Sequence, residues 1–167
     1  MKKIGIVFYC IILMLFCQYG PGAVAITEAQ STAVKDNCSS IKEDLKSLQK
    51  ADSRVRIYLG GYYETILAKF ITPLNVRLVE NNLSNASLVE NQNNFAGGKM
   101  VFANDFVNYQ QELELLINID CKKEPESFYE KLKVVREKRK TMVQDVAKMR
   151  VLISTHVKLV KDLEGSL

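Results

Sequence analysis

Apolar residues recur at alternating steps of three and four along most of this chain, a spacing that places them on one face of an α-helix. The clearest series lies near the end of the sequence and consists of Phe128, Leu132, Val135, Arg139, Met142, Val146, Met149, Ile153, His156, Val160 and Leu163. Pro125 suits the first turn of a helix, and Gly165 suits its end. The pattern therefore predicts one long helix from Pro125 to Gly165, with Arg139 and His156 as the polar members of its apolar face.

A second series of the same spacing precedes it: Leu88, Gln92, Phe95, Lys99, Phe102, Phe106, Tyr109, Leu113 and Leu116. Gly97 and Gly98 lie within this series, and each glycine costs a helix interior about 1 kcal/mol. We therefore expect a helix whose regular part begins near Lys99, with residues 88–98 as a looser lead-in.

The first series contains Val34, Cys38, Ile41, Leu45, Leu48, Asp52, Val55, Leu59, Tyr62 and Ile66. Pro73 predicts a kink or break, because proline lacks a backbone donor and disfavours helix at Thr72. The Asn- and Ser-rich residues 81–87 predict a turn. With a second connection near 121–125, residues 26–167 predict an all-α domain: an elongated antiparallel bundle of about three long helices with coiled-coil seams.

The first 25 residues have the features of an export signal. Lys2 and Lys3 precede an uncharged run from Ile4 to Cys17, and Ala23-Val24-Ala25 supplies a small-x-small cleavage site. This apolar run is shorter than the ~20 residues that span a bilayer as a helix. We therefore predict a signal peptide over 1–25 and a secreted or extracytoplasmic domain over 26–167. The alternative is an uncleaved membrane anchor.

Two cysteines, Cys38 and Cys121, follow the predicted cleavage site. An even number in an exported protein favours one disulfide. The midpoint between the two cysteines falls between Val79 and Glu80, next to the predicted turn that begins at Asn81. A hairpin closed by Cys38 and Cys121 would therefore turn where the sequence is most turn-like. The alternative, a reactive or metal-binding thiol pair, lacks a CxxC motif and a second histidine.

Two charged residues interrupt otherwise apolar helix faces. Asp52 follows Cys38 by nearly the same distance as Arg139 follows Pro125. If the first and third helices run in the same direction from a common end, these two residues lie at the same level. We therefore predict that Asp52 and Arg139 form a buried polar pair that fixes helix register.

Composition excludes several classes of function. Removal of residues 1–25 lowers the formal net charge from +4 to +2, which argues against a nucleic-acid binder. His156 is the one histidine and has no catalytic motif around it, so we expect a structural role for it. We predict no enzymatic activity, no metal site and no cofactor, because no acid, base and nucleophile are grouped.

Two segments are candidate interaction surfaces. The stretch "RIYLGGYY" at 56–63 brings Tyr58, Tyr62 and Tyr63 together beside two glycines, and tyrosines are frequent in recognition surfaces. The alternative is a kink with core tyrosines. The stretch "REKRK" at 136–140 contributes the basic side chains Arg136, Lys138 and Lys140. These could bind an anionic envelope polymer or form an ordinary solvated helix face.

The segments "DSRVRIYLGGYYETILAKFITPLNVRLVENN" (52–82) and "DFVNYQQELELLINIDCKKEPESFYEKLKVVREKR" (105–139) resemble small exported helical proteins of candidate-phyla, Saccharibacteria-like bacteria. The resemblance implies a location at the cell surface and no particular activity. We therefore expect a non-enzymatic structural or protein-interaction module of the cell envelope that binds a protein partner or itself. The alternative is a binder of anionic envelope polymer through the basic C-terminal helix. We expect membrane association only if the signal segment is retained.

Overall fold

The computed structural model describes residues 26–83 and 85–165, and the predicted signal peptide lies outside these ranges. The helices are α2 (Glu28–Asp36), α3 (Cys38–Ile66), the π-helical turn η1 (Leu67–Ile71), α4 (Thr72–Glu80), α5 (Ala86–Asn118) and α6 (Pro125–Glu164). No strand occurs in the two described ranges. The all-α prediction is therefore confirmed for this part of the chain.

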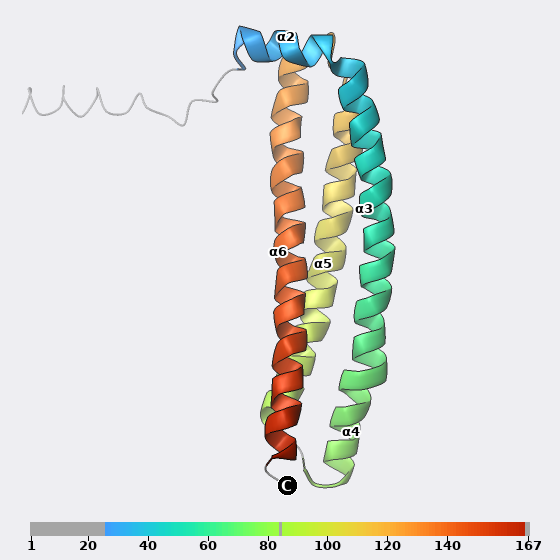
Figure 1. The fold of residues 1–167 in the computed structure, drawn as a ribbon, viewed down its shortest axis with the longest axis vertical. Helices are drawn as coiled ribbons and strands as arrows, with labels where there is room; N and C mark the ends of the chain where they lie inside the picture. The colour runs from blue at the N-terminus through green and yellow to red at the C-terminus, as the bar shows by residue number, and fades with distance from the viewer. Residues whose placement is uncertain (1–25, 84, 166–167) are drawn as a thin grey trace, which may run out of the picture.

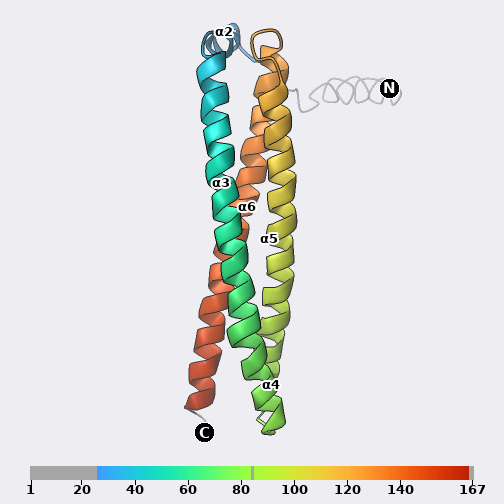
Figure 2. The same cartoon turned by 90° about the vertical axis from the view of Figure 1, so that its right-hand side faces the viewer.

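The helices run lengthwise beside one another in an elongated molecule (Figure 1). α3 continues through η1 into α4 as one column, α5 returns in the opposite direction, and α6 runs in the direction of α3. Figure 2 shows the same arrangement from the side, with α2 lying across one end. α5 packs most closely on α6 and next on α3. The core therefore lies along α5, whose buried side chains include Leu88, Phe95, Phe102, Phe106, Tyr109, Leu113 and Leu116.

The short helix α2 was not separated from α3 by the sequence pattern, which ran without a break from Val34 to Cys38. The structure places a turn at Asn37 between them. α2 begins with a capping box, in which the Thr27 and Gln30 side chains each accept a hydrogen bond from the other residue's backbone N–H. Gln30 also donates to the hydroxyl of Tyr129 at 3.2 Å, which joins α2 to the start of α6.

The prediction of a break at Pro73 is wrong because the chain stays helical there, but the regular α-helix is interrupted directly before it, at Leu67–Ile71. Thr72 has helical dihedral angles, and Pro73 lies in the first turn of α4, directly after the π-helical turn η1. The Thr72 N–H bonds to the carbonyl of Leu67, five residues back. A π turn is wider than an α turn. We infer that this widening accommodates the proline ring, which in a regular α-helix would clash with the carbonyl four residues before it.

The expected loose segment over 88–98 is also wrong, because α5 is continuous through Gly97 and Gly98. A Cβ atom at Gly98 would lie 2.8 Å from the Sδ of Met149, whereas one at Gly97 would meet nothing within 4 Å. Gly98 therefore lies where α6 leaves no room for a side chain on α5. The packing gained there offsets the weak helix propensity of glycine.

The predicted ends and turns agree with the structure. Residues 81–85 connect α4 to α5, and the Asn85 side chain accepts hydrogen bonds from the backbone N–H groups of Ser87 and Leu88. α6 begins at Pro125 and ends directly before Gly165. In the turn between α5 and α6, the backbone N–H groups of Lys122 and Lys123 donate to the carboxylate of Asp120.

Candidate functional site

The disulfide closes the end of the bundle where α3 begins and α5 ends. Cys38 and Cys121 are paired with a Cα–Cα distance of 5.6 Å, in agreement with the prediction from the cysteine count. Both residues are buried. The bond joins residues 83 apart in sequence, so it ties the first column to the second at one end of a long hairpin.

A polar junction lies nearer the disulfide end of the bundle than its other end and takes one residue from each column. Arg139 of α6 donates from Nε to Asp52 Oδ2 at 3.0 Å and from Nη2 to Asp52 Oδ1 at 3.3 Å. The pair predicted from helix register is therefore present. Tyr109 of α5 donates its hydroxyl to the same Oδ2 at 2.7 Å. Sequence reasoning missed Tyr109, because an aromatic residue on an apolar face gives no sign that its hydroxyl has a partner.

The environment of the junction shifts two pKa values. Burial raises the pKa of Tyr109 above its ordinary value, and the hydrogen bond to Asp52 raises it further. The hydrogen bond to Asp52 raises the pKa of Arg139, against a lowering by burial. Tyr109 therefore stays protonated as a donor and Arg139 stays charged. This arrangement joins three helices through one carboxylate.

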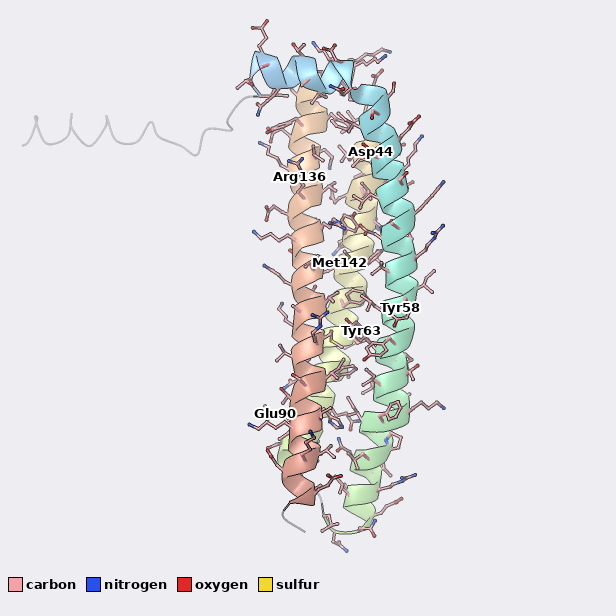
Figure 3. All side chains as sticks on the ribbon, in the orientation of Figure 1. Asp44, Tyr58, Tyr63, Glu90, Arg136 and Met142 are labelled. Carbon is pink, nitrogen blue, oxygen red and sulfur yellow. A yellow bond between two sulfur atoms is a disulfide. The ribbon has the colours of Figure 1, made fainter. Side chains whose placement is uncertain are left out.

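The three tyrosines of 56–63 do not form one surface. Tyr58 and Tyr62 are exposed, and their rings stack with centroids 6.4 Å apart. Tyr63 is 2% exposed and meets Phe95 and Phe102 edge-on, so the prediction that it contributes exposed surface is wrong, although its buried ring lies beneath a hollow that Tyr62 also lines. Figure 3 shows Tyr63 extending from α3 into the space between the columns. Tyr63 differs from Tyr62 in exposure because each helical residue is rotated about the axis relative to the one before it, so Tyr63 lies away from the face that Tyr58 and Tyr62 share.

The basic residues of 136–140 also separate. Arg136 lines a hollow between α6 and the first part of α3. Lys140 lies 3.7 Å from Glu137 on the exposed surface of α6. Lys138 is close enough to Asp105 of α5 to lower the pKa of that carboxyl. These three side chains point to different surroundings, as expected for residues that wrap around a helix.

A line of hollows follows the face between the first column and α6, and we call it the α3–α6 groove. The upper hollow, of about 450 Å³, is lined by Ile41, Asp44, Leu45, Leu48, Leu132 and Arg136. The middle hollow, of about 240 Å³, is lined by Leu59, Tyr62, Tyr63, Val146, Arg150 and Ile153. The lower hollow, of about 610 Å³, shares Ile153 with the middle one and is formed by η1, α4 and the last part of α6.

The lining of the α3–α6 groove combines apolar side chains with cations. Its basic residues are Arg136, Arg150, Lys69, Arg77 and Lys161, and its acidic residues are Asp44 and Glu164. The groove exists because α3 and α6 both pack on α5 rather than closely on each other. Figure 1 shows the corresponding arrangement of the helices, with α5 lying between the column of α3 and α4 and the column of α6. A groove of this kind can bind an elongated ligand that has both apolar and anionic groups.

His156 lies in the lower hollow of the groove, away from the polar junction. It is nine-tenths buried, its Nδ1 has no hydrogen-bond partner in the described part of the chain, and burial lowers its pKa. The imidazole is therefore neutral near pH 7. Among residues 26–83 and 85–165, no cluster of three or more His, Cys, Asp and Glu side chains is arranged to hold a metal ion. None of the helices in these ranges combines the length and apolar content that a bilayer crossing requires.

Comparisons of the chain with protein-family models, with curated proteins and with solved structures gave no match. The resemblance to exported proteins of candidate-phyla bacteria therefore stays a prediction.

Proposed function

We propose that this protein is an extracytoplasmic, non-enzymatic interaction module that binds a protein partner in the α3–α6 groove. The export-like first residues and the disulfide support the location, because structural disulfides persist in oxidising compartments. In this proposal the three columns, with coiled-coil seams, form a rigid rod that presents the groove. The observation that carries the proposal is the line of three apolar hollows along one face, each bordered by basic side chains.

The groove has the properties of a protein-binding surface. Apolar surface that is contiguous and bordered by polar groups marks interaction sites more often than scattered exposed residues do. Tyr62 and Val157 line the groove and are 45% and 48% exposed, so both are available to a partner. Tyr62 offers large contact area at low cost in conformational entropy.

Site-specific photocrosslinking tests this proposal. A photoreactive phenylalanine analogue is placed at Tyr62 or Val157, and the exported protein is irradiated with surface extracts of the cells that make it. The matched control position is Val151, which is 62% exposed on α6 and lines none of the hollows described above. We expect a discrete adduct from the two groove positions and none from Val151.

Two further measurements make the outcome decisive. The captured protein is purified and must bind the exported protein directly, and Val157→Arg must abolish this binding while Val151→Arg leaves it unchanged. Equal adducts from Val151 and Val157, or adducts from neither, contradict the proposal. An adduct with a second copy, together with a dimer mass in light scattering, identifies the partner as the protein itself.

The second candidate is a binder of anionic envelope polymer through α6. The excess of basic residues along α6 and in the groove favours it. The separate surroundings of Arg136, Lys138 and Lys140 give it less support than a single basic face would. Binding to purified anionic polymer distinguishes the two functions, because polymer binding should weaken steeply between low and moderate ionic strength.

A further inference from the structure

The lower hollow of the groove lies at the end of the bundle opposite the disulfide. The column formed by η1 and α4 borders one side, and the last part of α6 borders the other. Ile71 is fully buried at this level, Phe70 is exposed beside it, and Val157 and Val160 face them from α6. The two neighbouring residues differ in this way because they occupy successive positions of the π turn. The result is an apolar depression with an aromatic side chain at its edge.

Three cations surround this depression. Lys69 and Arg77 come from the first column and Lys161 comes from α6, so positive charge borders both sides. All three side chains are exposed, and none forms an ion pair within the described part of the chain. Glu164 is the acidic residue of the lining. The charge around the depression therefore complements an anionic occupant.

We propose that the lower hollow binds an amphipathic helix of a partner protein, with its apolar face against Phe70, Val157 and Val160 and acidic residues on its flanks facing Lys69, Arg77 and Lys161. This inference rests on the proposed function and specifies the partner's chemistry. The two walls of the hollow are helices that run in the same direction. A helix of the partner bound between them would contact both walls, which do not pack closely on each other. From Ile153 to Glu164 the lower hollow is about 16 Å long at the rise of an α-helix, which corresponds to about three turns of the occupant.

An extended peptide strand suits this site less well. Strand addition needs a sheet edge with free backbone donors and acceptors. The walls of the hollow are helices, whose backbone groups bond within each helix. Recognition here must therefore come from side chains, which an amphipathic helix presents at steps of three and four residues.

Two designed peptides test the proposal. Both carry leucines at steps of three and four and the same helix-locking crosslink on the outer face, and they differ only in having Glu or Lys on the two flanks. Binding of each labelled peptide to the oxidised, exported protein is measured by fluorescence anisotropy. We expect the Glu peptide to bind at least about tenfold more tightly than the Lys peptide, with a preference that shrinks as salt rises.

Charge reversal supplies matched variants. The triple variant Lys69→Glu, Arg77→Glu, Lys161→Glu should invert the preference, so that the Lys peptide binds more tightly. The control variant Lys122→Glu, Lys140→Glu, Lys158→Glu changes net charge by the same amount at exposed positions outside the hollow. It should retain the preference for the Glu peptide. Circular dichroism confirms that both variants stay folded.

The possible results separate this inference from the proposed function. Equal affinity for both peptides, or inversion by the control variant as well, overturns the acidic helix even if photocrosslinking locates a partner in the groove. Saturable binding of laurate with no binding of either peptide also overturns it and assigns the hollow to an acyl chain. Crosslinking that fails at both groove positions counts against the proposed function, whereas charge-dependent peptide binding measures the lower hollow directly.

Discussion

Arg139 and Tyr109 bond to the same carboxylate oxygen of Asp52, with donor–acceptor distances of 3.0 Å and 2.7 Å. Because the three residues belong to α6, α5 and α3, a single carboxylate connects all three columns at one level. Asp52 is buried, whereas the Arg139 side chain is 44% exposed. A shift of any column by one helical turn would break these bonds, so the junction favours one register.

A double-mutant cycle on Asp52 and Arg139 measures this coupling. Arg139→Leu leaves a buried carboxylate with one donor, and Asp52→Leu leaves the Tyr109 hydroxyl without its acceptor. We expect each single change to lower the free energy of unfolding by about 2–3 kcal/mol, below the values for fully buried pairs because Arg139 is partly solvated. The double variant should lose less than the sum, by about 1–2 kcal/mol, in urea denaturation at pH 7. Additive losses would show that the pair is not coupled.

Reduction of the Cys38–Cys121 bond should destabilise the folded protein. In the chain-entropy model, a loop of this length contributes about 4–5 kcal/mol by restricting the unfolded chain, and strain or residual structure lowers that value. Urea denaturation of the exported protein with and without a reducing agent measures the loss. The control is Cys38→Ala with Cys121→Ala, which should not respond to the reducing agent. Two free thiols in the unreduced protein, detected by mass spectrometry, would contradict the assignment.

The adjacent residues Gly97 and Gly98 should respond in opposite ways to alanine. Gly97→Ala meets open space in the interior of α5, so it should raise the free energy of unfolding by about 0.5–1 kcal/mol. Gly98→Ala places a methyl group 2.8 Å from Met149 Sδ and should lower it by about 1–3 kcal/mol. Thermal unfolding of the two variants and the parent protein measures both changes in stability. Stabilisation by both changes would mean that α5 and α6 are not in close contact at Gly98.

The carboxyl group of Asp105, beside Asp145, should make the free energy of unfolding depend on pH. Burial raises the pKa of Asp105 most. The hydrogen bond with Asp145 and the negative charge of Asp145 raise it further, and the positive charges of Lys138 and Lys148 lower it. A raised pKa in the folded state means that the folded protein holds this proton more tightly than the unfolded chain does. This contribution to stability is therefore present at acidic pH and is lost as pH rises above the ordinary value of 3.8.

Asp105→Asn tests this pH dependence, because its amide can donate to Asp145 Oδ2, which has no hydrogen-bond partner in the described residues. The variant should be more stable than the parent by about 1 kcal/mol at pH 7, and the difference should disappear near pH 3.5. The matched control is Asp162→Asn, which removes an exposed charge from α6 and should show no such pH dependence. A constant difference across this pH range would refute the interaction.

Pairs of residues at the same height in the bundle were the contacts that the sequence predicted best. The cysteine count and the Asn-rich turn gave the pairing of Cys38 with Cys121, and equal distances from the helix starts gave the pairing of Asp52 with Arg139. Both predictions needed only the helical rise and the order of the helices. They did not depend on side-chain detail, which is why they agree with the structure.

The errors arose where tertiary packing outweighs local propensity. The sequence pattern could not show that α6 approaches α5 at Gly98, or that a π turn precedes Pro73. Tyr63 was grouped with Tyr58 and Tyr62 because they are close in sequence. Tyr62 is exposed, however, and the next residue along the helix, Tyr63, is buried. The α3–α6 groove was not predicted, because it depends on which pair of helices fails to pack closely.

Covalent closure at one end only gives the rod a gradient of stiffness along its length. Near Cys38 the columns are held by a disulfide and crossed by α2, whereas at the opposite end they are held by side-chain packing and by hydrogen bonds such as those that Asn75 donates to Leu88 and Gln92. Local opening therefore requires less free energy toward the distal tip, where amide protons should exchange fastest. Hydrogen exchange measured along the rod should therefore rise from the disulfide end toward the turn between α4 and α5.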